Sequence, residues 1–301
     1  MALDPQRWLE LRRFRASHEV IGHRAGPRAR GPQAAASHPL SVVLGTSAGS
    51  VVGAALTSGS DLAVLPRLVS TGQLPVRPGT DIDLGPLMAL ASGPADPDTV
   101  MNRVIEHAPT ADTVEEADCL TRPLFRSFTG LPWPRPLHCT AIDTRSGQLR
   151  MWDFTAGVPL PQALAASCSI PGLFPPVTVG GIRYIDGGMR SPLNTTLAWG
   201  HQHVVAMSCF PLTATREAAD PPSVTEHRQA DEMEQLRSAN TRVTVIEPAP
   251  EYLTISQEGR GIMNTVRAMD AYEAGLGQAD KALIEGLAPA AEGEVLDVLL
   301  A

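Results

Sequence analysis

The chain has 301 residues, 43% of them hydrophobic and 19% charged, which is typical of a globular protein and excludes a disordered or fibrous one. Its formal net charge of −8 argues against a nucleic-acid-binding protein, which needs a basic surface. No stretch has the pattern of a secretory signal peptide or a membrane span, so we expect a cytoplasmic protein.

The chain begins with a segment rich in arginine, glycine and proline. Residues 1–40 carry weak helix and strand signals, and we expect them to form an irregular N-terminal segment. The remainder, residues 41–301, is predicted to be one domain.

Strands and helices alternate along this domain. The β-branched run at residues 41–44 predicts a buried strand, and the small residues at 48–58 predict a helix after it. Proline and glycine predict loops at 73–98 and 122–136. Further strands are predicted at 137–142, 148–154, 182–185, 203–210 and 242–247, and further helices at 161–167, 224–239 and 258–287.

Two of these patterns predict how the elements pack. The short turn between 142 and 148 predicts an antiparallel hairpin, so the α/β sheet should be mixed. Apolar residues recur at helical spacing near the end of the chain and predict a core-facing stripe; they are Ile262, Val266, Met269, Tyr272 and Leu276.

Residues 45–49 read GTSAG and fit the pattern G-x-S-x-G. A serine on a sharp strand-to-helix turn is exposed, and the flanking glycines let neighbouring backbone pass closely. Ser47 would then stand at a helix N-terminus, where free N–H groups favour negative charge. Ser47 is therefore a candidate nucleophile, with the N–H of Ala48 as oxyanion donor. The alternative is a glycine-rich turn without chemistry.

A nucleophilic serine needs a base. Asp186 follows a predicted strand and precedes two glycines, Gly187 and Gly188, which places a carboxylate at a strand end next to flexible backbone. An Asp-Gly-Gly sequence is also an ordinary turn, and alone it favours that simpler interpretation.

A conventional Ser-His-Asp triad is a second possibility. Ser47, Asp186 and one of His201, His203 or His227 follow in the order found in α/β-hydrolases. The early position of the serine in the chain argues against that fold.

Considered together, the two segments resemble the patatin-like phospholipase family. The residues GTSAGSVVG at 45–53 are similar to its bacterial branch, and DGG at 186–188 is similar to its aspartate motif. Residues 165–177 and 187–194 resemble the family's sequence on either side of that aspartate. The resemblance covers roughly residues 41–287.

The resemblance implies a three-layer α/β/α fold with a central, mostly parallel sheet. It also implies a serine acyl hydrolase acting on lipid esters, with a catalytic dyad of Ser47 and Asp186 and no histidine. An acyl-enzyme on Ser47 would be the intermediate, and no cofactor is implied. The partner would be a lipid or acyl-ester substrate, and peripheral membrane contact is compatible with it.

One part of the family pattern is not found. The glycine-rich oxyanion loop should lie some 30 residues before the serine, but residues 12–19 contain no glycine and 26–31 lack a glycine triplet. We expect the first strand and this loop to be missing or altered, with Gly31 as a second oxyanion donor. The alternative function is an impaired or truncated domain that binds lipid or a partner.

The cysteines and histidines do not predict a metal site. Cys119, Cys139, Cys168 and Cys209 are too far apart for zinc-ligand or redox spacing, and we expect buried free thiols. The close pair of histidines at 201 and 203 has no third ligand nearby in the sequence.

Overall fold

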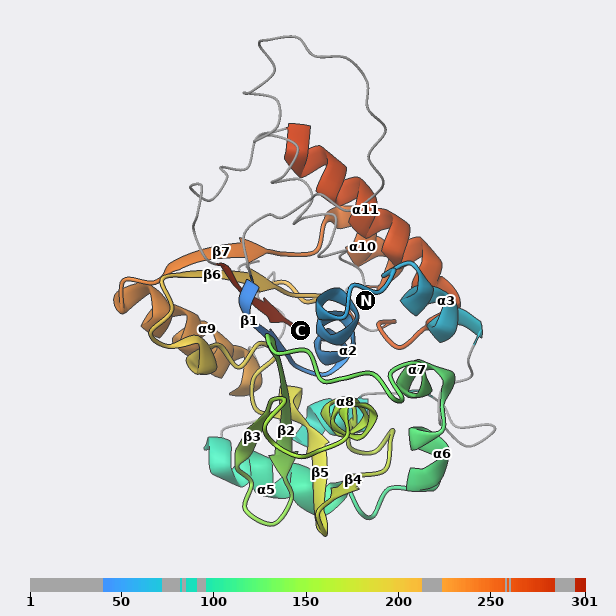
Figure 1. The fold of residues 1–301 in the computed structure, drawn as a ribbon. Helices are drawn as coiled ribbons and strands as arrows, with labels where there is room; N and C mark the ends of the chain where they lie inside the picture. The colour runs from blue at the N-terminus through green and yellow to red at the C-terminus, as the bar shows by residue number, and fades with distance from the viewer. Residues whose placement is uncertain are drawn as a thin grey trace, which may run out of the picture.

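The protein folds around one mixed β-sheet with helices on both faces (Figure 1). The computed structural model describes residues 40–71, 82, 85–90, 96–212, 224–257, 259, 261–284 and 296–301. All but the last residue of the predicted irregular segment 1–40 therefore lies outside the described residues.

The described elements are these. The strands are β1 (Leu40–Gly45), β2 (Leu137–Asp143), β3 (Leu149–Trp152), β4 (Val177–Val179), β5 (Ile182–Asp186), β6 (His203–Met207), β7 (Arg242–Ile246) and β8 (Leu296–Leu300). The α-helices are α2 (Ala48–Thr57), α3 (Val64–Thr71), α4 (Gly85–Leu90), α5 (Pro97–His107), α6 (Glu116–Leu120), α7 (Pro123–Arg126), α8 (Leu160–Ser167), α9 (Val224–Ser238), α10 (Pro250–Ile255) and α11 (Ala268–Ile284). Short 3₁₀ helices are η1 (Gly187–Met189), η2 (Thr195–Ala198) and η3 (Thr265–Arg267).

The sheet order is β4-β5-β2-β1-β8-β6-β7, with β3 paired to β2. The central strands are parallel: β1 pairs with β2 and β8, and β6 pairs with β7 and β8. The strands β3, β4 and β5 add antiparallel pairs at one side, including the predicted β2–β3 hairpin. The predicted α/β/α fold with a mostly parallel sheet is confirmed.

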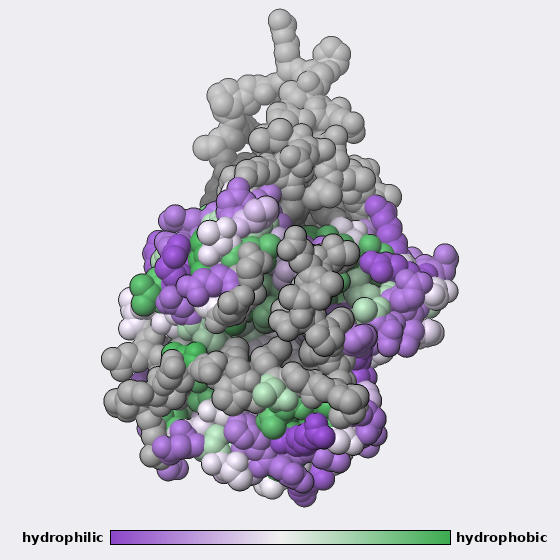
Figure 2. All heavy atoms as spheres, turned by 180° about the vertical axis from the view of Figure 1, so that it is seen from behind, coloured by the Kyte–Doolittle hydropathy of each residue, from purple (hydrophilic) through white to green (hydrophobic). Residues whose placement is uncertain are grey.

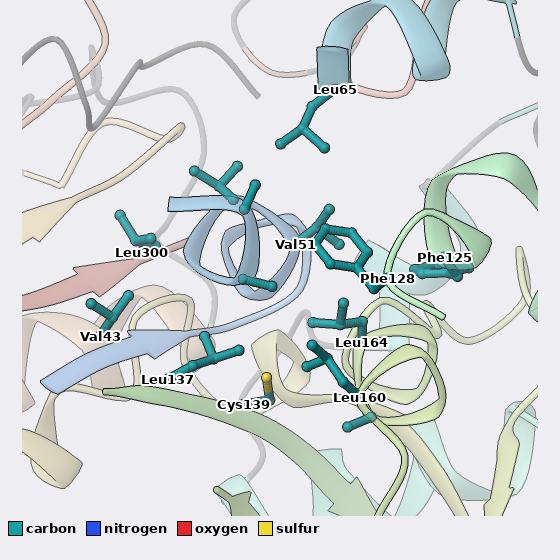
Figure 3. Close-up of a cluster of buried hydrophobic side chains, with 14 of the residues drawn as sticks. Val43, Val51, Leu65, Phe125, Phe128, Leu137, Cys139, Leu160, Leu164 and Leu300 are labelled. Atoms are coloured by element: carbon teal, nitrogen blue, oxygen red, sulfur yellow. The ribbon is translucent and has the colours of Figure 1, made fainter. Parts of the chain in front are cut away.

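The central strands are mostly apolar, as expected of strands that helices cover on both faces. Successive side chains of a strand point to opposite faces, so Val43 belongs to one core and Leu44 to another. On the first face, β1, β2 and β8 pack against α2 and α8 (Figure 3). The labelled side chains Val43 and Leu137 project from their strands toward α2, and Leu164 projects from α8 on the same side of the sheet.

The second face is covered by α9 and α5. Met233 and Leu236 of α9 pack against the alternate residues of β6 and β8. Met101 and Val104 of α5 pack against β2 and β5 nearer the antiparallel side of the sheet. The two helical layers hold the parallel strands between them, and the turn between β1 and α2 lies at the carboxyl ends of these strands.

The last strand, β8, was not predicted. It lies between β1 and β6, in the middle of the sheet, and its centre is fully buried at Val298. A charged residue, Asp297, interrupts its short apolar run and hides the strand signal in the sequence. The structure accommodates this carboxylate by hydrogen bonds from Ser41 and His201.

Both edges of β1 are paired, one with β2 and the other with β8. The edge of β1 that does not pair with β2 is therefore taken by β8, a strand from the C-terminal end of the sequence. Residues 1–39, including the predicted oxyanion candidate Gly31, lie outside the described residues.

Three local predictions were wrong. The regions 73–98 and 122–136, predicted as loops, contain α4, the start of α5 and α7. Proline is tolerated in the first turn of a helix, and both α5 and α7 begin that way. The predicted core-facing stripe is also wrong: Val266 lies in η3 and is 80% exposed, and the buried positions of α11 include Ala271 and Ala279 rather than Tyr272 and Leu276.

Candidate active site

Ser47 lies at the sharp turn between β1 and α2. Its backbone has φ 53° and ψ −129°, which side-chain-bearing residues rarely adopt. Such a conformation costs of order 1–3 kcal/mol and persists only where its surroundings impose it. The turn presents the Ser47 side chain at the carboxyl edge of the sheet, and its hydroxyl lines a cavity.

The two glycines of the motif are needed for steric reasons. A Cβ on Gly45 would lie 2.3 Å from the Cα of Ser50. A Cβ on Gly49 would lie 2.2 Å from the carbonyl oxygen of Leu300 in β8. Both positions therefore exclude any larger residue unless backbone moves, as the sequence motif predicts.

The Ser47 hydroxyl donates a hydrogen bond to Oδ2 of Asp186 over 2.5 Å. Asp186 ends β5, and its Oδ1 accepts the N–H of Gly188 at 2.7 Å. The Asp186 N–H in turn donates to the carbonyl of Ser169 at 3.0 Å. Two sequence-predicted residues that are far apart in the chain are therefore brought into direct contact.

Asp186 is buried, and its electrostatics follow from that burial. Only 1% of the residue is exposed. Desolvation raises the pKa of its carboxyl to about 7, against the lowering effect of hydrogen bonds from Ser47 and Gly188. A carboxyl with a pKa near neutrality can accept and return a proton under ordinary conditions.

Further hydrogen bonds fix the backbone around the two candidate residues, Ser47 and Asp186. The N–H of Ser47 donates to the hydroxyl of Ser167 at 3.0 Å, at the end of α8. On the other side, Asn194 donates to the hydroxyl of Thr46 and to the carbonyl of Gly187, both at 3.2 Å. The Thr46 hydroxyl also lies 2.9 Å from that of Thr140 in β2.

The predicted oxyanion donor Ala48 is the first residue of α2. N–H groups in the first turn of a helix have no acceptor within the helix, so they are free to bind an anion. Ala48 lines the same cavity as Ser47.

The histidines of the alternative triad lie elsewhere. His201 precedes β6 and bonds to Asp297 through Nδ1 over 2.6 Å, while Nε2 of His203 lies 2.9 Å from the Thr244 hydroxyl. Both are at the amino edge of the parallel strands, whereas Ser47 follows the carboxyl end of β1. His227 is exposed on α9. The structure pairs Ser47 with Asp186 and with none of these three.

An apolar cavity of about 210 Å³ adjoins Ser47. Its wall combines side chains of α2, α3, α7 and α8 with the segment around η3. Val51 of α2 and Phe125 of α7 are two of these lining side chains (Figure 3). An alkyl chain is the kind of ligand that such a wall favours.

Among the described residues, the cysteines and the possible metal ligands form no second candidate site. All four cysteines are free, and Cys139 and Cys119 are buried. Burial raises the pKa of Cys119 to about 11, so this thiol stays protonated at neutral pH. Within the described part of the chain, no cluster of three or more His, Cys, Asp or Glu side chains could hold a metal ion.

Several residues around the site were not singled out in the sequence. Ser167 and Thr46 have no pattern of their own, since hydroxyl side chains are common in helix ends and turns. Asn194 lies in the segment that resembles the family, yet only the structure shows its bonds. Arg122, on the cavity wall, lies in a stretch predicted as a loop.

No helix in the described ranges is long and apolar enough to cross a membrane. Figure 2, which shows the molecule from behind, has mostly hydrophilic residues on its coloured surface, with small apolar patches between them.

Comparison with known families gives one match. The family model described as patatin-like phospholipase matches residues 29–199, which is more than half of the chain. The matched range contains both Ser47 and Asp186. None of the curated proteins compared with this sequence matches it.

Proposed function

This chain belongs to the patatin-like phospholipase family, and from this premise we propose that it is a serine acyl hydrolase of lipid esters with a Ser47–Asp186 dyad. The observation that carries the dyad is the 2.5 Å hydrogen bond from the Ser47 hydroxyl to the Asp186 carboxylate. The strained backbone of Ser47 supports the same role, because such strain is most often kept at functional sites.

In the acylation step, Asp186 takes the hydroxyl proton as Ser47 Oγ attacks the ester carbonyl. A C–O bond forms, and the carbonyl oxygen becomes an oxyanion. The N–H of Ala48 stabilises that negative charge, and the position of Ala48 as the first residue of α2 supports this role. When the tetrahedral intermediate collapses, the ester C–O bond breaks, and Asp186 returns its proton to the departing alcohol.

Deacylation repeats these steps with water. Asp186 takes a proton from the water molecule, whose oxygen attacks the acyl carbon on Ser47. Collapse releases the fatty acid and returns the proton to Ser47 Oγ. The cavity beside Ser47 would hold the acyl chain throughout, because its wall is mostly apolar.

Fluorophosphonate labelling tests this proposal. The reagent forms a covalent bond only with an activated serine, so wild-type protein should label and Ser47→Ala should not. Asp186→Asn should label at least 100-fold more slowly, since the serine loses its base. Ser58→Ala is the matched control, because Ser58 is exposed at the other end of the same helix and should label like wild type.

Two results would contradict the proposal. Well-folded wild-type protein that does not label would favour the alternative of an impaired domain that binds lipid or a partner. Undiminished labelling of Asp186→Asn would exclude the dyad, and histidine variants at 201, 203 and 227 would then test the alternative triad.

A further inference from the structure

A positively charged residue lies on the wall of the apolar cavity. Arg122 stands between α6 and α7, and its side chain lines the same cavity as Ser47. Its Nε atom is buried and has no hydrogen-bond partner. A buried N–H of a charged group without a partner is costly, and this cost falls on a residue of the cavity wall.

The charges around the cavity are not balanced. Of the described residues that line it, Arg122 and Arg267 are cationic and none is acidic. Arg267 is about half exposed and donates to Asp270. Burial lowers the pKa of the Arg122 guanidinium and outweighs the raising effects of Cys119 and Asp118. The guanidinium remains cationic at neutral pH because its ordinary pKa is so high.

We propose that Arg122 determines substrate specificity by binding an oxyanion that the acyl-ester substrate itself carries, a phosphate or a carboxylate. This inference rests on the proposed acyl hydrolase function. A guanidinium presents several N–H donors in one plane and matches both oxyanions with charge-assisted hydrogen bonds. The surrounding apolar wall strengthens such bonds by excluding water.

The competing explanation is that Arg122 only packs its aliphatic stem against the cavity wall. Long cationic side chains often cover apolar surface in this way and leave the charged end in water. The unpartnered Nε favours a binding role, since packing of the stem alone leaves the cost of that buried donor without compensation. Arg122→Met separates the two explanations, because methionine keeps an apolar stem and removes the charge.

The test compares three octanoyl esters that differ in the group carried by the alcohol. They are 1-octanoylglycerol 3-phosphate, 2-(octanoyloxy)acetate and the neutral 1-octanoylglycerol. The measured quantity is the ratio of kcat/KM for each anionic ester to kcat/KM for the neutral one. We expect Arg122→Met to lower this ratio about tenfold or more and Arg122→Lys to restore part of it. Arg126→Met, at the exposed end of α7, should leave the ratio unchanged.

The outcomes distinguish the source of the oxyanion. A fall for the phosphate ester alone identifies a phosphate, a fall for the other anionic ester alone identifies a carboxylate, and a fall for both identifies a general anion site. An unchanged ratio for both anionic esters in Arg122→Met would overturn the inference.

A binding measurement keeps this inference separate from the proposed function. In Ser47→Ala protein, which cannot turn over, octyl phosphate and octanoate are titrated with and without Arg122→Met. We expect the second substitution to weaken binding of at least one of them about tenfold. If wild-type protein hydrolyses none of the three esters, the proposed function fails while this titration still decides on Arg122. Equal binding to both proteins would overturn the role of Arg122 even if the esters are cleaved.

Discussion

Asn194 donates to the hydroxyl of Thr46, the residue immediately before Ser47, and so joins the two halves of the candidate dyad. The same side chain also donates to the carbonyls of Gly187 and Ser191, in the loop that follows Asp186. One buried amide therefore sets the distance between the turn that carries the serine and the loop that carries the aspartate.

This loop is held in turn by α9. The carboxylate of Glu232 accepts hydrogen bonds from Ser191 and Arg190, and it forms an ion pair with Arg190 at 2.8 Å. Gln229 accepts from Ser191 and from the N–H of Leu193. The helix is thus part of the support of the site, although its own residues lie outside the cavity.

Removing the Asn194 side chain should weaken the connection between the turn that carries Ser47 and the loop that follows Asp186. Asn194→Gly keeps the left-handed backbone, φ 48°, but leaves the carbonyls of Gly187 and Ser191 without this donor. We expect kcat to fall about tenfold with a smaller change in KM, since the lost bonds position the dyad rather than the substrate. Asn240→Gly is the control, because Asn240 is also left-handed, φ 64°, but exposed after α9. Equal effects of the two substitutions would contradict this role.

The pH dependence of activity should report the ionisation of Asp186. The carboxyl must be ionised to accept the serine proton, and burial raises its pKa to about 7. The rate of fluorophosphonate labelling should therefore rise with pH, with a midpoint near that value and not near the ordinary pKa of an aspartate. The residual rate of Asp186→Asn should not show this transition. A midpoint below about pH 5 in wild-type protein would contradict the buried environment of Asp186.

The same burial predicts that Asp186 reduces stability above neutral pH. In the unfolded chain its pKa is near 3.8, so between that value and about 7 the folded state binds more protons than the unfolded state. The contribution of Asp186 to the free energy of unfolding therefore falls as the pH rises across that window. Asp186→Asn should raise the free energy of unfolding by about 1–4 kcal/mol at pH 8. The size of the pKa shift of Asp186 sets the upper end of this range. The gain should shrink as the pH is lowered toward 4.

Urea denaturation of both proteins at pH 8 and pH 4.5 measures this difference. The asparagine can keep the main contacts, since its carbonyl oxygen can accept the N–H of Gly188 and its amide can donate to Ser47. Equal stability of the two proteins at pH 8, or a gain that grows toward acid pH, would contradict the prediction.

The sequence predicts the elements that depend on local pattern. Strand β1 and helix α2 were found because a β-branched run, two glycines and a run of small residues lie next to one another. The β2–β3 hairpin was found from its turn, and α8 and β5 from their flanking prolines and glycines. These features depend on interactions within a few residues, which sequence pattern expresses directly.

The parts that sequence pattern could not predict depend on distant contacts. Ser47 and Asp186 are 139 positions apart, and only the resemblance to a known family predicted a dyad of these two residues without a histidine. Strand β8 was missed because the apolar environment that makes Leu299 and Val298 a central strand comes from β1 and β6. Arg122 reaches the cavity through the packing of α7 against α8, which has no trace in the local sequence.

The close approach of β8 to the serine turn gives the last prediction. The Leu300 carbonyl accepts the N–H of Thr46 at 2.9 Å and lies where a Cβ on Gly49 would be. Gly49→Ala must therefore push apart β8 and the first turn of α2. We expect a loss of about 2 kcal/mol or more in the free energy of unfolding, together with loss of labelling at Ser47.

Gly277→Ala is the matched control for this substitution. Gly277 lies within α11, and a Cβ there would meet no atom within 4 Å. Alanine in a helix interior is favoured over glycine by about 0.5–1 kcal/mol, so this variant should be slightly more stable than wild type and fully labelled. The two variants make the same chemical change in a helix, and only the contact with Leu300 differs. A stable, fully labelled Gly49→Ala protein would show that β8 does not restrict the serine turn.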